Sequence, residues 1–349
     1  MSAYSLKLKL HQLFHWEYWP FGIVYLPIYV VWMYYAFRSR SFFFGTASNP
    51  TITNGGFLME SKKQIYDLIP AQHYPKTYYW NKAISVEENC RNAANKISFP
   101  MIVKPDIGMR GMAIKKLDDI ESLRNYAAQM PVDFMVQEYI SYPYECGIFY
   151  VRIPGTDKGK ITGIVSKELL AVTGDGKSTI RELIIANPRF HFQLDAIEKI
   201  IGHEIETIPA KGENKLLVPF GNHCRGAKFI DDSAAITEQL SNTIDTLCKQ
   251  IPGFYFGRMD IKYQHPDELK EGKNFCIIEL NGAGSEPTHI YDPKHSIWYA
   301  WQEITRHLNY LYQISKHNRL SGFRALTTME GIRMLLANKR HVQLLKSVS

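Results

Sequence analysis

The longest apolar run in the chain lies near its N-terminus. Residues 20–37 (PFGIVYLPIYVVWMYYAF) contain no charged side chain, and Arg38 and Arg40 follow directly. As a helix, at about 1.5 Å per residue, this run would measure about 27 Å, slightly less than the ~30 Å hydrocarbon core of a bilayer. The pattern favours a single membrane-spanning helix. The alternatives are a re-entrant or interfacial helix bent at Pro27, a buried core helix and a cleaved signal peptide.

Short apolar stretches bounded by turn residues follow this run, and they alternate with helical patterns. This mixture predicts a fold of the α+β class. The predicted strands span residues 101–103, 112–117, 134–138, 160–171, 257–263 and 275–284, and a further strand begins at Glu145. The predicted helices span residues 60–69 and 233–251, and another begins at an N-cap formed by Ser178.

The C-terminal segment, residues 323–346, has the pattern of one or two basic amphipathic helices. Its apolar positions could form a stripe along one helix face, and they are Ile332, Leu335, Leu336 and Val342. Such a helix either docks on a membrane surface or packs on the body of the protein, and the pattern does not choose between the two.

The charge of the chain is concentrated at its two ends. Of a net charge of +7 over 349 residues, residues 1–40 carry +3 and residues 316–349 carry +6, which leaves the 275 residues between them at −2. This distribution argues against a nucleic-acid binder with a basic groove through its body and fits a body held near an anionic membrane. The alternative is that the basic ends are merely solvated. With 45% hydrophobic residues and a mean hydropathy of −0.23, the chain has enough apolar residues for a large core and is not a polytopic membrane protein.

Cysteine and histidine patterns offer no metal site. The five cysteines are scattered without a CxxC pair, which argues against zinc and disulfide frameworks and fits a reducing compartment. The twelve histidines include no HExxH motif.

Two segments have features suited to a nucleotide. A short strand ends at Lys104, and a loop with Gly108 and Gly111 follows it. Glycine lets backbone N–H groups approach phosphate oxygens and lysine adds a positive charge, although many ordinary hairpins also contain glycine. Further on, a strand–connector–strand unit has Glu138 and Glu145 on either side of its connector. Its backbone could pair with an adenine edge while Glu145 accepts ribose hydroxyls, and an ordinary hairpin is the alternative.

The two last predicted strands carry the strongest chemical pattern. Arg258 and Asp260 lie on one, and Glu279 and Asn281 lie on the other. Adjacent strands that present oxygen ligands at one end suit Mg²⁺, which shares its coordination shell with nucleotide phosphates. Arg258 could neutralise the same phosphates. Structural ion pairs are the alternative explanation.

Taken in this order, the segments from about Ser61 to about Thr305, roughly 70% of the chain, resemble the ATP-grasp superfamily of carboxylate–amine ligases. The resemblance implies two α+β subdomains gripping ATP, behind a short membrane-associated helical segment. It also implies phosphate contacts from Lys104 and from Lys62 or Lys63, and catalytic roles for Lys104 and Arg258. The other implied residues form a lid (Gly108, Arg110, Gly111), an adenine hinge with its ribose contact (Glu138, Tyr139, Ile140, Glu145) and a metal site (Asp260, Glu279, Asn281).

Two branches of the superfamily are similar in detail. GRMD and IIELN resemble D-alanine–D-alanine ligase, whereas residues 172–188 and 209–231 resemble ligases related to cyanophycin synthetase and fused glutathione synthases. The second resemblance implies further ligand contacts from Lys167 and Arg225. The loop after Asn281 (GAGSEPTHIYDP) is unlike the carboxylate-binding loop of dipeptide ligases, and the usual N-terminal α/β domain is reduced.

The resemblance implies an ADP-forming ligase that uses ATP and Mg²⁺, with Mn²⁺ as a second option. A substrate carboxylate would form an acyl phosphate, and an amine would then displace the phosphate. We expect one substrate to be lipid-linked or presented at the cytoplasmic face of the inner membrane. A phosphotransferase acting on a hydroxyl and a nucleotide-binding scaffold without turnover are the alternatives.

The expected domain divisions are 1–40 (membrane segment), 41–98 (reduced N-terminal subdomain), 99–182 (lid subdomain), 183–315 (metal-site subdomain) and 316–349 (basic tail).

Overall fold

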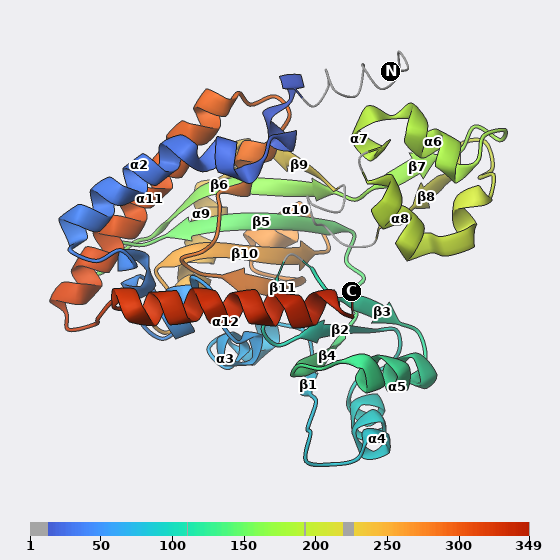
Figure 1. The fold of residues 1–349 in the computed structure, drawn as a ribbon, viewed down its shortest axis with the longest axis horizontal. Coiled ribbons are helices and arrows are strands. Elements are labelled where there is room, and N and C mark those ends of the chain that lie inside the picture. The colour runs from blue at the N-terminus through green and yellow to red at the C-terminus, as the bar shows by residue number, and fades with distance from the viewer. Residues whose placement is uncertain (1–12, 110, 192, 219–226, 349) are drawn as a thin grey trace.

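Two antiparallel sheets form the centre of the structure, a computed structural model that describes residues 13–109, 111–191, 193–218 and 227–348 (Figure 1). The smaller sheet has the strand order β1-β4-β2-β3 and the larger one the order β11-β10-β5-β6-β9. The strands of the smaller sheet are β1 (Thr77–Tyr79), β2 (Met101–Pro105), β3 (Lys115–Leu117) and β4 (Phe134–Glu138). Those of the larger sheet are β5 (Tyr144–Val151), β6 (Lys160–Glu168), β9 (Lys228–Asp231), β10 (Phe256–Tyr263) and β11 (Phe275–Asn281).

Two helices, α4 (Val86–Lys96) and α5 (Ile120–Gln129), complete the smaller lobe. Each begins at a side-chain cap, since Ser85 accepts from the Glu88 N–H group and Asp119 accepts from the Ser122 N–H group. Their apolar faces pack with the sheet in one core, formed by Cys90, Ala93, Ile97, Met101, Val103, Leu117, Leu123, Tyr126, Phe134 and Val136.

The larger sheet is buried on both faces. Successive side chains of a strand point to opposite faces. Ile148 and Tyr150 of β5 therefore pack in the core that includes α9 (Glu238–Lys249). Phe149 and Val151 pack instead in the core that includes α11 (Ile297–Leu320). The short segments η7 (Ser233–Ala235), α10 (Pro266–Lys270) and η8 (Thr288–Tyr291) connect these elements.

A small separate unit is inserted between β6 and β9. It contains β7 (Ala171–Thr173), α6 (Ile180–Ala186), α7 (Pro188–His191), α8 (Leu194–Ile201), η5 (Gly202–Glu206) and β8 (Asn214–Leu216). The predicted cap at Ser178 is one residue early, because Thr179 and Glu182 form the capping box of α6. Ser178 instead donates its hydroxyl to Asp175 at 2.8 Å, which closes the preceding turn.

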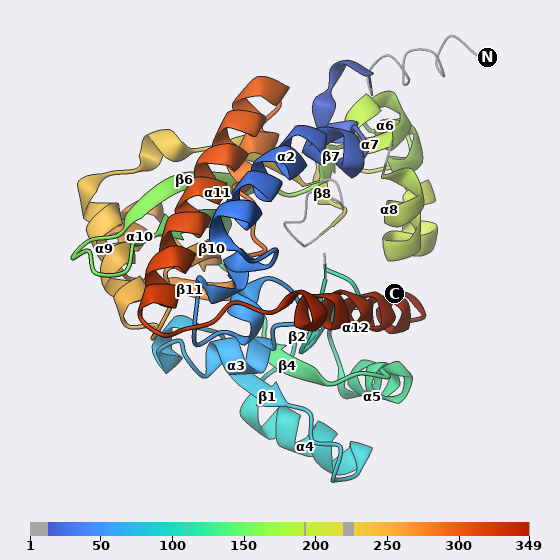
Figure 2. The same ribbon diagram turned by 60° about the vertical axis from the view of Figure 1, so that its left-hand side comes forward.

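The apolar run of the N-terminus forms one helix, α2 (Phe21–Ser39), which follows η1 (Trp16–Tyr18). By length and composition α2 could cross a membrane, although buried core helices and signal sequences meet the same criterion. It lies along α11 and runs in the same direction, as both views show (Figures 1 and 2). The chain continues through η2 (Phe44–Ala47), η3 (Thr53–Gly56), α3 (Lys62–Tyr66) and η4 (Ala71–His73) to the smaller lobe.

The C-terminal helix α12 (Thr328–Lys346) extends from the end of α11 to the smaller lobe (Figure 1). Its Gly331 lies against the ring of Phe43, where a Cβ atom would have no room. Near its other end, Leu345 is buried with Ala113 and Val132. Of the two predictions for this segment, packing on the body is therefore observed, and docking on a membrane stays a prediction.

The α+β class predicted from the sequence is confirmed, and β4 has the predicted bounds. The predicted helix over residues 60–69 is wrong in length, because only Lys62–Tyr66 is α-helical. Helix α11 was not among the predicted elements. The predicted domain divisions stay predictions.

Candidate functional site

The four polar side chains singled out on the last two strands lie in register. Arg258 pairs with Asn281, and Asp260 pairs with Glu279, across the antiparallel strands β10 and β11. Because residues two apart on a strand share a face, all four lie on the same face of the sheet. The neighbouring strand leaves room for them, since a Cβ atom at Gly147 would lie 3.0 Å from Asp260 Oδ1.

Asp260 is the centre of a buried ion-pair network. Its carboxylate accepts from Arg258 Nε at 2.9 Å, and Lys167 Nζ lies 3.2 Å from its other oxygen. Lys167 also donates to Glu145 at 2.8 Å. Burial by itself would raise the pKa of Asp260, but Arg258 and Lys167 outweigh it, so the pKa lies below its ordinary value. Asp260 is therefore ionised at neutral pH.

Glu279 is the more accessible carboxylate, with 37% of its side chain exposed, and Lys62 Nζ lies 3.4 Å from it. Lys63 points elsewhere, because it pairs with Asp67 at 2.7 Å on the surface. Asp106 holds this end of α3 in place through two backbone groups, accepting from the N–H groups of Lys62 and Lys63. Of the two lysines between which the sequence did not choose, Lys62 is thus the one beside the predicted metal ligands.

Lys104 lies at the end of β2 with only 5% of its surface exposed. Its ammonium donates to the Tyr66 hydroxyl at 2.7 Å and to the Ile278 carbonyl at 3.0 Å, which connects the smaller sheet to β11. Burial, helped by the nearby positive charge of Lys62, lowers the pKa of Lys104 to about 7. A negative charge placed beside this ammonium group would raise the pKa of Lys104, and the lysine would then take up a proton.

The predicted hinge, Glu138 to Ile140, connects the two sheets. The ring of Tyr139 lies near two ammonium groups, 5.2 Å from Lys116 Nζ and 5.6 Å from Lys262 Nζ. Lys262 also donates to the Ile140 carbonyl at 3.2 Å. Beside the hinge there is a hollow of about 280 Å³, whose lining includes Pro143, Tyr144, Glu145, Ser166, Lys167 and Tyr263.

The glycine loop of the predicted lid begins next to Lys62. A Cβ atom at Gly108 would lie 3.1 Å from Lys62 Nζ, so glycine keeps this approach open. Gly111 has a φ angle of 73°, a conformation that favours glycine. Arg110 and Arg225, the two other predicted contacts, lie outside the described residues.

The residues at the end of β10 and β11 fit a divalent cation with oxygen ligands. Among the described residues no three His, Cys, Asp or Glu side chains cluster as a metal site. Mg²⁺ does not need such a cluster, because it often takes one or two carboxylates together with phosphates and water. Asn281 supports the fit, since its amide nitrogen is buried without a hydrogen-bond partner in the described part of the chain. Turning this amide would put its oxygen, a ligand that suits Mg²⁺, in the place of the unpaired nitrogen.

Glu286, which was not among the predicted site residues, lies next to this cluster. Its carboxylate accepts hydrogen bonds from the hydroxyls of Tyr25 on α2 and Tyr291, the latter at 3.1 Å. Its backbone carbonyl accepts from Arg258 at 3.4 Å. An acidic residue in a Gly-, Ser- and Pro-containing loop, directly after the strand predicted to carry metal ligands, was the signal that could have found it.

No family model matches this chain, and no curated protein is similar to it. Solved structures are similar in fold. A bifunctional glutathione synthetase from Pasteurella multocida is 17% identical over 75% of this chain and 38% of its own, with a TM-score of 0.39. VanG D-Ala:D-Ser ligase from Enterococcus faecalis is 14% identical over 75% of this chain and 64% of its own, with a TM-score of 0.43.

D-alanine–D-alanine ligase from Bacillus anthracis, complexed with ATP, is 10% identical over 78% of this chain and 71% of its own, with a TM-score of 0.43. This chain therefore spans less than two thirds of the first two enzymes. The similar structures are of the kinds that the sequence resemblance named. At these TM-scores the activity has to be argued from the chain's own residues.

Proposed function

We propose that this protein is an ATP-dependent, ADP-forming carboxylate–amine ligase. One observation carries the proposal, namely the convergence of four basic side chains on two carboxylates and an amide at the meeting point of the two sheets. The basic residues are Lys62, Lys104, Lys167 and Arg258, and the oxygen ligands come from Asp260, Glu279 and Asn281. This arrangement suits a polyphosphate with its metal ion, because it offers both positive charge and hard oxygen ligands.

In this proposal the protein positions the reactants and balances their charge. A substrate carboxylate attacks the γ-phosphorus of ATP, the bond to the ADP oxygen breaks, and an acyl phosphate and ADP result. An amine then attacks the acyl carbon, and phosphate leaves as the amide forms. Lys104 and Lys62 hold phosphate oxygens from the side of the smaller sheet, while Arg258 holds the transferred phosphoryl group from the larger one. Mg²⁺, held by Asp260, Glu279 and Asn281, would neutralise phosphate charge.

The same proposal assigns the nucleoside to the hinge. The backbone of residues 138–140 would meet the adenine edge, and Glu145 would accept a ribose hydroxyl. The glycine loop around Gly108 and Gly111 would cover the triphosphate and keep water out.

We further propose that one of the two substrates is lipid-linked or presented at the cytoplasmic face of the inner membrane. The apolar surface of α2 and the basic surface of α12 support this. So does the contact of Tyr25, on α2, with Glu286 beside Arg258, because it brings the N-terminal helix to the edge of the site.

Trapping with hydroxylamine tests the reaction. The full-length protein is given ATP, Mg²⁺, hydroxylamine and a panel of carboxylic acids, with and without lipid extract, and ADP and hydroxamate are measured. A ligase forms hydroxamate and ADP in equal amounts, because hydroxylamine captures the acyl phosphate. ADP with a phosphorylated hydroxyl compound and no hydroxamate would identify a phosphotransferase, and ATP binding without turnover would identify a scaffold. Equal hydroxamate yields without lipid extract would remove the lipid-linked substrate from the proposal.

The lowered pKa of Lys104 predicts that ATP binding takes up a proton. In the free protein this lysine is mostly neutral above its pKa of about 7 and mostly charged below it. Phosphate oxygens stabilise the charged form and raise the pKa, so uptake should approach one proton near about pH 8 and fall towards zero near about pH 6.

Calorimetric titrations with MgATP in buffers of different ionisation enthalpy measure this uptake. The Lys104→Met variant should lose it, while Lys63→Met, which removes a surface lysine, should keep it. Proton uptake that is the same in wild type and Lys104→Met would show that Lys104 does not face the phosphates.

A further inference from the structure

The outward face of α2 is apolar along its whole length. Five residues spaced three or four apart form this outer stripe, and each is 55–84% exposed: Ile23, Leu26, Val30, Met33 and Phe37. A helix on the surface of a water-soluble protein normally carries polar residues on that face. An exposed apolar surface of this extent indicates an interaction site.

The opposite face of α2 is attached to α11 from one end to the other. Near its N-terminus the Trp301 indole donates to the Val24 carbonyl at 2.7 Å. Further along, the rings of Tyr35 and Tyr312 stack at 4.8 Å. At the C-terminus Arg319 donates to the Ser39 carbonyl at 2.6 Å. The two helices therefore form one layer, and α2 cannot change its depth in a membrane without α11.

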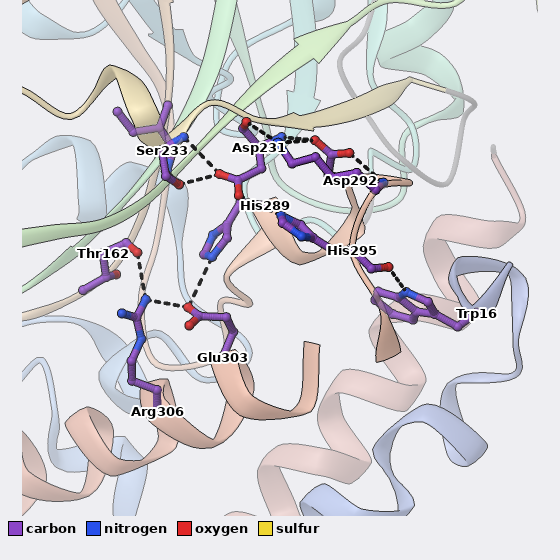
Figure 3. Close-up of polar contacts among 11 residues, drawn as sticks. Trp16, Thr162, Asp231, Ser233, His289, Asp292, His295, Glu303 and Arg306 are labelled. Atoms are coloured by element: carbon purple, nitrogen blue, oxygen red, sulfur yellow. Dashed lines mark hydrogen bonds and ion pairs between the residues drawn. The ribbon is translucent and has the colours of Figure 1, made fainter. Parts of the chain in front are cut away.

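The helix α11 has polar groups that keep it out of hydrocarbon. Glu303 is buried against the larger sheet, where Arg306 donates to it and His289 Nε2 lies 3.3 Å away (Figure 3). Arg306 also donates to the Thr162 carbonyl at 2.9 Å. The short helix η1 is attached close to the start of α11, because the Trp16 indole donates to the His295 carbonyl at 2.9 Å (Figure 3). If α2 crossed a bilayer in this arrangement, ionised groups of α11 would enter the membrane with it, which is unfavourable.

The surroundings of the outer stripe favour lipid over a second copy of the chain. Residues 18–59 contain no Asp or Glu, and the exposed Arg38 and Arg40 lie at the C-terminal end of α2. Trp298, 73% exposed, lies close to the other end, one turn before the Trp301 contact with Val24. Apolar side chains between an interfacial tryptophan and arginines that meet phosphate headgroups are typical of a helix lying in an anionic membrane surface.

We infer that α2 is an in-plane membrane anchor. Its outer stripe enters the upper acyl region of an anionic bilayer, its inner face stays on α11, and the helix does not cross. The nucleotide site is held at a set height above the lipid, because Tyr25 on the same helix contacts Glu286 of the site. This inference does not depend on the ligase reaction, since vesicle binding is measured without turnover.

Flotation of the full-length protein with vesicles tests the surface. Vesicles of phosphatidylcholine alone are compared with vesicles that also contain phosphatidylglycerol. We expect binding to the phosphatidylglycerol vesicles, at least about tenfold weaker binding for the double variant Leu26→Glu/Val30→Glu, and no change for Ile208→Glu, which adds one glutamate at an exposed isoleucine outside α2. Unchanged binding of the double variant would overturn the inference. A wild-type dimer that the double variant dissociates, without vesicle binding, would overturn it in favour of a second copy.

Protease protection separates the in-plane helix from a spanning one. An epitope tag is placed before Met1, the protein is bound to preformed vesicles, and protease is added outside. An in-plane α2 leaves the tag as accessible as it is without vesicles. Protection of the tag that is lost on adding detergent would show that the segment crosses, and would overturn the inference. Thermal unfolding of each variant is the control for folding. We expect the fold to be retained, because the substituted side chains are solvent-exposed.

Discussion

Replacing Glu279 by glutamine is expected to lower kcat for ATP-dependent ADP release by about 10²–10³-fold while the fold is retained. Glu279 is partly exposed and lies 3.4 Å from Lys62 in an ion pair, so we expect its charge to matter more for a bound metal and phosphate than for stability. Asp260 is less suitable for this test, because removing its charge would leave Arg258 and Lys167 buried without their partner.

The measurement is steady-state ADP release over a range of Mg²⁺ concentrations, together with the thermal midpoint of unfolding. We expect the variant to need more Mg²⁺ and to unfold close to the wild-type temperature. Glu271→Gln is the matched control, because this exposed glutamate pairs with Lys273 at 2.9 Å away from the site, and its removal should leave ADP release unchanged. Wild-type kcat in the Glu279 variant would remove this residue from the proposed metal site.

Replacing Gly257 by alanine is expected to destabilise the protein by about 3 kcal/mol. A Cβ atom at this position on β10 would lie 2.0 Å from the carbonyl oxygen of Asn281 on β11. That oxygen belongs to the backbone of the neighbouring strand, so no side-chain rotation can relieve the overlap and the two strands have to separate. Because Asn281 is also a proposed metal ligand, the displacement should reduce ADP release as well.

Chemical denaturation monitored by circular dichroism measures the change in the free energy of unfolding. Gly22→Ala is the matched control, because a Cβ atom there would meet nothing within 4 Å and alanine favours a helix. We expect this variant to be as stable as the wild type or slightly more stable. A Gly257→Ala variant with wild-type stability would contradict the close approach of β10 and β11 on which the register of the site depends.

Much of the candidate site could be named from the sequence, because strand patterns are local. The alternation of side chains along β10 and β11 puts Arg258 and Asp260 on one face, and Glu279 and Asn281 on one face, whatever the rest of the chain does. That these faces coincide depends on strand register, which the Arg258–Asn281 and Asp260–Glu279 pairs establish only in the folded protein.

Other parts of the site depend on contacts between distant segments. Lys62 and Lys63 are equivalent as adjacent lysines in the sequence, and only the attachment of α3 to Asp106 directs Lys62 to Glu279 and Lys63 to the surface. Glu286 was not predicted as a site residue, because its position beside the site depends on contacts with residues distant in the sequence. Tyr25 lies 261 residues before it, and Arg258 belongs to another strand.

The N-terminal helix shows most clearly the difference between features that follow from local sequence and features that follow from contacts between distant segments. By itself the sequence determined that residues 20–37 are apolar and followed by arginines, and it predicted a helix there, since propensity, hydropathy and charge belong to each residue and its neighbours. A spanning helix and a helix lying on a protein share that pattern. Which face of α2 is covered was decided only by the tertiary structure, because the faces differ in what they touch rather than in composition. Val24, Ile28 and Ala36 are covered by α11, while the equally apolar outer stripe is left uncovered.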